Sequence, residues 1–106
     1  MLPGRYLFLF IIIISGMNAF PALAETIQVT IDKLVYSPVE IKAKVDDTIE
    51  WINKDIVAHT ATARGDWDVM IAANSSASLV LKKAGTVDYY CRFHPNMKGR
   101  ITIAPK

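Results

Sequence analysis

The chain has 106 residues, a formal net charge of +2 at pH 7 and a single cysteine. One cysteine cannot form an internal disulfide, and the near balance of charge argues against nucleic acid or an acidic membrane surface as a partner. A chain of this length supports one small domain with a limited core, which a bound metal would help to stabilise.

The first 24 residues are predicted to be a secretory signal peptide. An unbroken apolar run covers residues 7–14, Arg5 precedes it, and Ala22 and Ala24 supply small residues at the positions that a signal peptidase reads. A membrane-spanning helix needs about 20 predominantly apolar residues, and this run is shorter. We therefore expect cleavage after Ala24, a periplasmic protein without a stable membrane anchor, and a mature domain of residues 25–106.

Export makes the lone cysteine informative. In an oxidising compartment a free thiol tends to oxidise or to pair with another chain. We therefore expect Cys91 to be either buried and inert or occupied by a metal.

Alternation of apolar and polar residues predicts short strands along the mature chain. Expected strands cover residues 27–31, 39–45, 49–51, 59–63, 77–82, 87–91 and 100–103. Residues 64–73 mix apolar side chains with charges, and we expect a loop that packs over the sandwich. Short strands at this spacing, separated by turn residues, predict an all-β fold built as an antiparallel two-sheet sandwich.

Three residues with metal-binding chemistry follow one another near the C-terminus. Cys91, His94 and Met97 are spaced three apart in the loop expected between the last two strands, which can turn their side chains to one point. Two histidines and one cysteine with a weak axial methionine form the electron-transfer type of copper site. The chain has one further histidine, His59. We predict one copper ion bound by these four residues.

Each of these residues alone has a more ordinary explanation. A histidine beside a strand is usually structural, a methionine usually packs in a core, and a single cysteine often behaves as a small buried hydrophobe. Their occurrence together at this spacing in an exported all-β chain favours a metal site over coincidence. Zinc is disfavoured because thioether is not among its usual ligands, and c-type haem is excluded by the missing Cys-x-x-Cys-His motif.

The segment that carries these residues resembles the ligand loop of the cupredoxins, the type 1 blue copper proteins. Residues 85–99 carry the resemblance, and the Cys-x-x-His-x-x-Met spacing is similar to that of amicyanins and shorter than in plastocyanins. Residues 51–60 resemble the family's segment around its first copper histidine. The resemblance spans residues 25–106 and implies a Greek-key cupredoxin-like sandwich with one type 1 copper ion.

The resemblance also implies roles for neighbouring residues. His59 is expected to be the buried ligand and His94 the ligand that reaches the surface. Thr60 is expected to donate its backbone N–H to the Cys91 sulfur, but it lacks the amide side chain that ties the two ligand segments together in many relatives. Asn53 is expected to lie just behind the ligands.

A docking surface is expected around the exposed histidine. By resemblance, Phe93 and Pro95 form an apolar patch beside His94, through which electrons would pass. The surrounding basic rim is expected to consist of Arg92, Lys98 and Arg100. A solvated loop face remains an equal explanation for these three charges.

These features predict an electron carrier that shuttles single electrons between redox proteins. We expect a monomer whose donor and acceptor are of the dehydrogenase, cytochrome c or oxidase type. It is not expected to be an enzyme, since four protein ligands leave no open position on the metal. Two other classes stay open: a copper-delivery or storage protein, which would use exposed Met or His clusters, and a metal-free binding sandwich.

Overall fold

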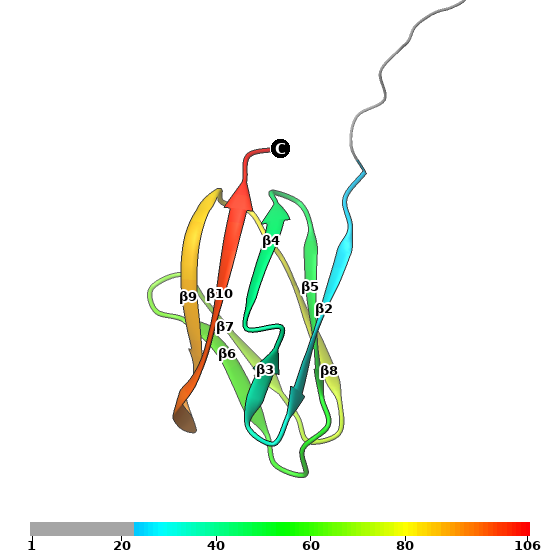
Figure 1. Ribbon diagram of the computed structural model, residues 1–106, viewed down its shortest axis with the longest axis vertical. Coiled ribbons are helices and arrows are strands. Elements are labelled where there is room, and N and C mark those ends of the chain that lie inside the picture. The colour runs from blue at the N-terminus through cyan, green and yellow to red at the C-terminus, as the bar shows by residue number, and fades with distance from the viewer. Residues whose placement is uncertain (1–22) are drawn as a thin grey trace, which may run out of the picture.

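The computed structural model describes residues 23–106, which form two packed β-sheets (Figure 1). The predicted signal peptide, residues 1–24, lies almost wholly outside the described residues. Within residues 23–106 no helix is long and apolar enough to cross a membrane.

Five strands form one sheet and four form the other. In spatial order the first sheet contains β4 (Glu40–Lys44), β10 (His94–Ala104), β9 (Gly85–Cys91), β6 (His59–Ala63) and β7 (Trp67–Ile71). The second contains β3 (Val35–Ser37), β2 (Thr26–Asp32), β5 (Thr48–Asn53) and β8 (Ser76–Val80).

The prediction of an all-β two-sheet sandwich is confirmed, and each sheet includes one parallel pair. β4 runs parallel to β10, and β2 runs parallel to β5, while the other neighbours are antiparallel. Alternation of apolar residues reports which face of a strand is buried and not the direction of its neighbour, so the sequence pattern cannot reveal these parallel pairs.

The core lies between the two sheets and is rich in aromatic side chains. Trp51 of β5 donates its indole N–H to the hydroxyl of Tyr89 on β9 at 3.2 Å, which joins the two sheets. The rings of Tyr36 and Tyr89 meet edge to face with centroids 4.7 Å apart. Burial raises the pKa of Tyr89 to about 12, so its hydroxyl stays neutral as an acceptor for Trp51.

One segment was wrongly expected to be a loop. Residues 67–71 form β7, which pairs antiparallel with β6 at the edge of the first sheet. Trp67, Val69 and Ile71 face inward in alternation with the exposed Asp68 and Met70. An apolar side chain at an exposed position hides the period-two pattern from the sequence.

Four connections lie at one end of the sandwich (Figure 1). These are the β2–β3 turn (residues 33–34), the β5–β6 loop (residues 54–58), the β7–β8 loop (residues 72–75) and the short β9–β10 turn (residues 92–93). β10 begins at residue 94 and not at residue 100 as expected, so the β9–β10 connection is a tight turn. The strand residues next to two of these connections, the β5–β6 loop and the β9–β10 turn, carry the candidate site.

Candidate metal centre

His59, Cys91 and His94 come together at this end of the molecule. Their potential ligand atoms all lie within 4.8 Å of one another. The Cys91 Sγ lies 3.6 Å from His59 Nδ1 and 3.7 Å from His94 Nδ1. His59 and Cys91 are fully buried, whereas His94 is half-buried. One thiol and two imidazole nitrogens therefore face one point, which is open to solvent on the His94 side.

The sheet brings these distant residues together. His59 is the first residue of β6 and Cys91 the last of β9, and the two strands are antiparallel neighbours. The first residue of one strand therefore lies beside the last residue of the other. His94 pairs directly with Cys91 across the β9–β10 turn. The three-residue spacing of Cys91 and His94 is therefore the spacing of two residues that pair across a tight hairpin turn.

Met97 enters through an irregularity in β10. The register between β9 and β10 shifts between His94 and Lys98, so Pro95, Asn96 and Met97 form a β-bulge. A bulge re-aims side chains and is common next to functional sites. Met97 is buried, whereas its bulge neighbours are exposed. The thioether is therefore the side chain of the bulge that turns into the protein.

The donor set fits a transition-metal ion. Imidazole nitrogen and thiolate sulfur bind such ions at about 2.0–2.3 Å, which separates neighbouring ligand atoms by roughly 3.3–4.0 Å. The two nitrogen–sulfur distances at Cys91, 3.6 and 3.7 Å, fall in this range. A set of thiolate, imidazole and thioether donors suits copper better than harder ions. The residues present are thus compatible with the predicted copper ion.

Asp55 orients the buried histidine and was missed by the sequence analysis. Its Oδ2 lies 2.8 Å from His59 Nε2. Burial opposes ionisation of Asp55, but hydrogen bonds from Leu34 N–H, the His59 ring and Lys33 N–H outweigh it and hold its pKa below the usual range. An ionised carboxylate only accepts, so Nε2 carries a proton, which in a neutral ring makes Nδ1 the nitrogen with the lone pair, on the Cys91 side.

Asn53 acts on the site through the loop that carries Asp55. It is buried, and its Oδ1 accepts the Asp55 N–H at 2.9 Å. Its Nδ2 donates to the carbonyl oxygens of Val57 and Ala72 at 2.9 and 3.1 Å. Asn53 therefore holds the β5–β6 loop to the segment that follows β7. No hydrogen bond joins it to a histidine or cysteine among residues 23–106.

Thr60 makes hydrogen bonds beside the sulfur with its N–H, its carbonyl and its hydroxyl. Its N–H donates to Cys91 Sγ at 3.4 Å, and its carbonyl accepts the Tyr36 hydroxyl at 2.5 Å. Its own hydroxyl accepts the Arg92 N–H at 2.9 Å. Thr60 carries no amide, as noted from the sequence, but its hydroxyl itself ties the segment of His59 to the segment of Cys91.

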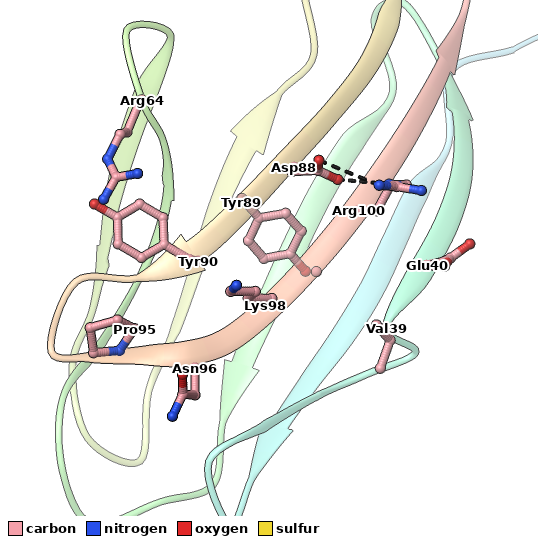
Figure 2. A pocket seen from close by; sticks show the side chains of 11 residues that line it. Val39, Glu40, Arg64, Asp88, Tyr89, Tyr90, Pro95, Asn96, Lys98 and Arg100 are labelled. Carbon is pink, nitrogen blue, oxygen red and sulfur yellow. Dashed lines mark hydrogen bonds and ion pairs between the residues drawn. The ribbon is translucent and has the colours of Figure 1, made fainter.

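Two of the three rim cations are engaged in ion pairs. Arg92 binds Asp68 through two hydrogen bonds of 3.0 and 3.1 Å. Arg100 binds Asp88 through bonds of 2.7 and 3.4 Å, drawn as dashed lines in Figure 2. Lys98 has no ion-pair partner among residues 23–106. The rim therefore offers less free positive charge than the sequence alone suggests.

A groove of about 820 Å³ lies beside the Asp88–Arg100 ion pair (Figure 2). It is lined by residues of β4, β9 and β10 and by Arg64, whose guanidinium carbon lies 4.5 Å from the centroid of the Tyr90 ring. Pro95 and Asn96 of the bulge reach into its wall. Arg64 could not be predicted from the sequence, because a cation over an aromatic ring has no spacing signature.

Apolar side chains are exposed at the histidine end. Phe93 is 48% exposed next to His94, and the Arg92 guanidinium carbon lies 5.4 Å from its ring centroid. The β5–β6 loop adds Ile56, 86% exposed, and Val57. The loop and the β9–β10 turn lie at the same end of the sandwich (Figure 1). Exposure of a large apolar side chain on a loop is typical of a contact surface.

Sequence comparison relates the chain to small copper proteins. The profile of the family described as Cupredoxin-like domain matches residues 5–103. Amicyanin of Paracoccus denitrificans is 33% identical over 87 residues, which cover 73% of this chain and 64% of that protein. The chain thus spans slightly less than two thirds of that relative. Plastocyanin of Prochlorothrix hollandica is 27% identical over 88% of this chain and 86% of its own.

Solved structures give the same relationship in three dimensions. A reduced Cu(I) form of an amicyanin variant superposes with a TM-score of 0.69 at 32% identity, covering 74% of this chain and 81% of the other. An oxidised amicyanin variant gives the same TM-score, identity and coverage. The overlap therefore extends over about three quarters of the chain.

Proposed function

This chain belongs to the cupredoxin-like family, and we propose that it is an exported type 1 blue-copper protein that carries single electrons between redox partner proteins. One observation supports this most directly: Cys91 and two histidines from separate parts of the chain direct their donor atoms at one point. Buried polar side chains normally pair with fixed partners. The three donors are one thiol sulfur and two imidazole nitrogens, with no carboxylate among them. Such a set of soft and borderline donors suits a copper ion.

His59, Cys91, His94 and Met97 are the proposed copper ligands. Copper bound there supplies a one-electron Cu(I)/Cu(II) couple. The protein holds the donors in place: Asp55 fixes the His59 tautomer, and hydrogen bonds of Thr60 join the segments that carry His59 and Cys91. A fixed donor set limits rearrangement when the charge of the ion changes. The amicyanin structures that resemble the chain include Cu(I) forms.

Electrons are proposed to pass through the half-buried His94. Phe93 and Pro95 flank it and form the apolar contact, and Lys98 is the rim cation left without an ion pair among the described residues. The apolar side chains orient the partner protein against His94. Because Lys98 is the one rim cation without an ion pair among the described residues, docking should depend only weakly on ionic strength. The partners are donor and acceptor redox proteins, of the dehydrogenase, cytochrome c or oxidase type.

Export to the periplasm is part of this proposal. The apolar run of residues 7–14 and the small residues before Glu25 support a signal peptide cleaved after Ala24. The mature protein is then residues 25–106, acting as a monomer. A buried Cys91, shielded from oxidants and engaged by copper, suits an oxidising compartment.

The test is the colour of the mature protein with cupric ion. Added Cu(II) should give an intense visible band from charge transfer between thiolate and copper, together with a reversible one-electron wave in voltammetry. Cys91→Ala should abolish the band, because no other thiol is present.

Met70→Leu is the matched control for the methionine ligand. Met70 is 53% exposed on β7, whereas Met97 is buried in the bulge. Met70→Leu should leave the band unchanged, while Met97→Leu should shift both the band and the potential. A parent protein that stays colourless with Cu(II), or that loses its copper at once to a weak chelator, contradicts the proposed function.

A further inference from the structure

A closed ring of hydrogen bonds passes through both the backbone and the side chain of Arg92. The Arg92 N–H donates to Thr60 Oγ1 at 2.9 Å, and the hydroxyls of Thr60 and Thr62 lie 2.9 Å apart. Thr62 Oγ1 donates to Asp68 Oδ1 at 2.5 Å. The Arg92 Nε–H donates to the same carboxylate oxygen at 3.0 Å. The ring therefore begins and ends on the residue that follows Cys91.

Every donor in the ring has an acceptor. An ionised carboxylate only accepts, so Thr62 spends its proton on Asp68 and must accept from Thr60. The Thr60 oxygen is then free to accept the Arg92 N–H. The hydrogen bond from Arg92, followed by that from Thr62, holds the pKa of Asp68 below its usual range, which keeps this carboxylate an acceptor.

The ring connects the interior to the surface. Thr60 and Thr62 are buried on β6, whereas Asp68 on β7 and Arg92 after β9 are exposed. A hydroxyl buried on a strand cannot turn to water if its partner is lost, so a change at the surface is felt inside. Thr60 also donates its N–H to Cys91 Sγ at 3.4 Å, which carries the effect to the sulfur.

We propose that this ring holds the Cys91–His94 segment against β6 before any metal binds, with Arg92 as its positioning residue. The inference rests on the proposed function, because the segment matters as the carrier of two proposed ligands. The surface ion pair of Asp68 and Arg92 is thereby connected to the site. It fixes the hydroxyls of Thr62 and Thr60, and Thr60 in turn binds the Arg92 N–H and the Cys91 sulfur.

A second ion pair on the same sheet provides the comparison. Asp88 and Arg100 join β9 to β10 with the same two-bond geometry, and both are exposed. No threonine hydroxyl continues from Asp88 into the interior among the described residues. If the Asp68–Arg92 pair were only a surface ion pair, removing the Asp68 carboxylate would affect the site as little as removing the Asp88 carboxylate.

The test measures amide hydrogen exchange in metal-free mature protein by NMR. Asp68→Ala and the isosteric Thr62→Val should each speed exchange of the Arg92 N–H by about tenfold, a loss expected for one hydrogen bond. Thr62→Ser keeps the hydroxyl and should restore the slow exchange. Asp88→Ala should leave the Arg92 N–H as slow as in the parent.

Copper-loaded protein gives a second readout. Asp68→Ala and Thr62→Val should weaken the hydrogen bond from Thr60 to the sulfur and so shift the thiolate-to-copper band and lower the reduction potential. Thr62→Ser and Asp88→Ala should retain the band and potential of the parent. A purely structural role would lower stability without moving the band.

The outcomes separate this inference from the proposed function. Arg92 exchange that is unchanged in both Asp68→Ala and Thr62→Val overturns the ring, even in a protein that is blue. The same rise in Asp88→Ala overturns it as well, because the effect would then belong to any ion pair of the sheet. A protein with the expected exchange pattern that binds no copper overturns the function and leaves the ring standing.

Discussion

Asp55 shows how one side chain can prepare a metal site. Its carboxylate accepts hydrogen bonds from the His59 ring and from the N–H groups of Lys33 and Leu34 at 2.7 and 3.0 Å. Lys33 and Leu34 have φ angles of 53° and 62°, a left-handed conformation that costs roughly 1–2 kcal/mol for each L-residue. The hydrogen bonds to Asp55 offset part of this cost, so the turn and the histidine are fixed together.

Replacement of Asp55 by alanine tests this coupling. The Nε2–H of His59, which is fully buried in the parent, would lose its acceptor. We expect metal-free protein to lose about 1–3 kcal/mol in urea unfolding. Because partners of metal-binding histidines set ring orientation, copper affinity should fall by about 10- to 100-fold, as measured by competition with a chelator.

Asp32→Ala is the control for this change. Asp32 ends β2, is exposed, and has no ion-pair or side-chain hydrogen-bond partner among residues 23–106. Its loss should leave both the unfolding curve and the copper affinity as they are. Equal copper affinity of Asp55→Ala and the parent would show that His59 does not depend on Asp55 for its orientation.

At the scale of elements, regular alternation was enough to predict most strands, but not the early start of β10 that makes a hairpin of Cys91 and His94. β7 was missed because Met70 places an apolar side chain on its exposed face. The hydrogen-bond partners of the site were missed for a different reason. Asp55 comes from a loop and Asp68 from an edge strand, and only the tertiary fold brings them to His59 and Arg92.

The β9–β10 hairpin depends on a missing side chain. Gly99 pairs with Tyr89, and a Cβ on this glycine would lie 2.4 Å from Tyr89 Cζ and 2.6 Å from its hydroxyl oxygen. The Tyr89 ring is held from its other sides, because it contacts Tyr36 and accepts a hydrogen bond from Trp51. A buried ring fixed in this way cannot move aside at low cost.

Gly99→Ala should therefore destabilise the protein despite the higher strand propensity of alanine. We expect a loss of about 1–3 kcal/mol in the free energy of unfolding, the usual cost of overfilling a packed core, measured by urea denaturation. The near-ultraviolet circular dichroism of the aromatic cluster should change as the Tyr89 ring is displaced.

A double-mutant cycle checks that the cost arises from Tyr89. Tyr89→Leu removes the atoms that the added methyl group would meet. In that background Gly99→Ala should cost much less than in the parent, because contacting residues couple in their effects on stability. An equal cost in both backgrounds would place the strain in the backbone of β10 and not in the contact with the ring.

On the scale of the whole molecule, the two ends of the sandwich have different tasks. The candidate ligands lie at the end formed by the β2–β3, β5–β6, β7–β8 and β9–β10 connections (Figure 1). At the opposite end, the buried Asp47 accepts the Glu25 N–H and the Lys44 N–H, both at 2.9 Å, and its backbone bonds Leu81. The carboxylate therefore joins the start of the domain to the β4–β5 turn, and the Asp47 backbone adds the segment after β8.

Asp47→Asn should lower stability at neutral pH and leave the copper site unchanged. Its amide nitrogen would face N–H donors, and the loss should be about 1–3 kcal/mol in urea unfolding. The hydrogen bond from Glu25, which exceeds the opposing effect of burial, and those from Lys44 hold the pKa of Asp47 below its usual value of about 4. Its contribution is therefore present above that value and is lost as pH falls through the lower folded-state pKa.

The pH profile and a neighbouring residue together make this prediction specific. The stability difference between Asp47→Asn and the parent should disappear in acid, because the protonated carboxyl of the parent no longer accepts both N–H groups. Asp46→Asn is the matched control: among residues 23–106 the Asp46 side chain pairs only with the exposed Lys82 and Lys106, so its loss should matter little. If cleavage follows Ala24 as proposed, the Glu25 amine carries a charge and strengthens its bond to Asp47. Acetylating that amine in the mature protein should then lower the stability of the parent but not of Asp47→Asn, and equal loss in both would contradict the pairing.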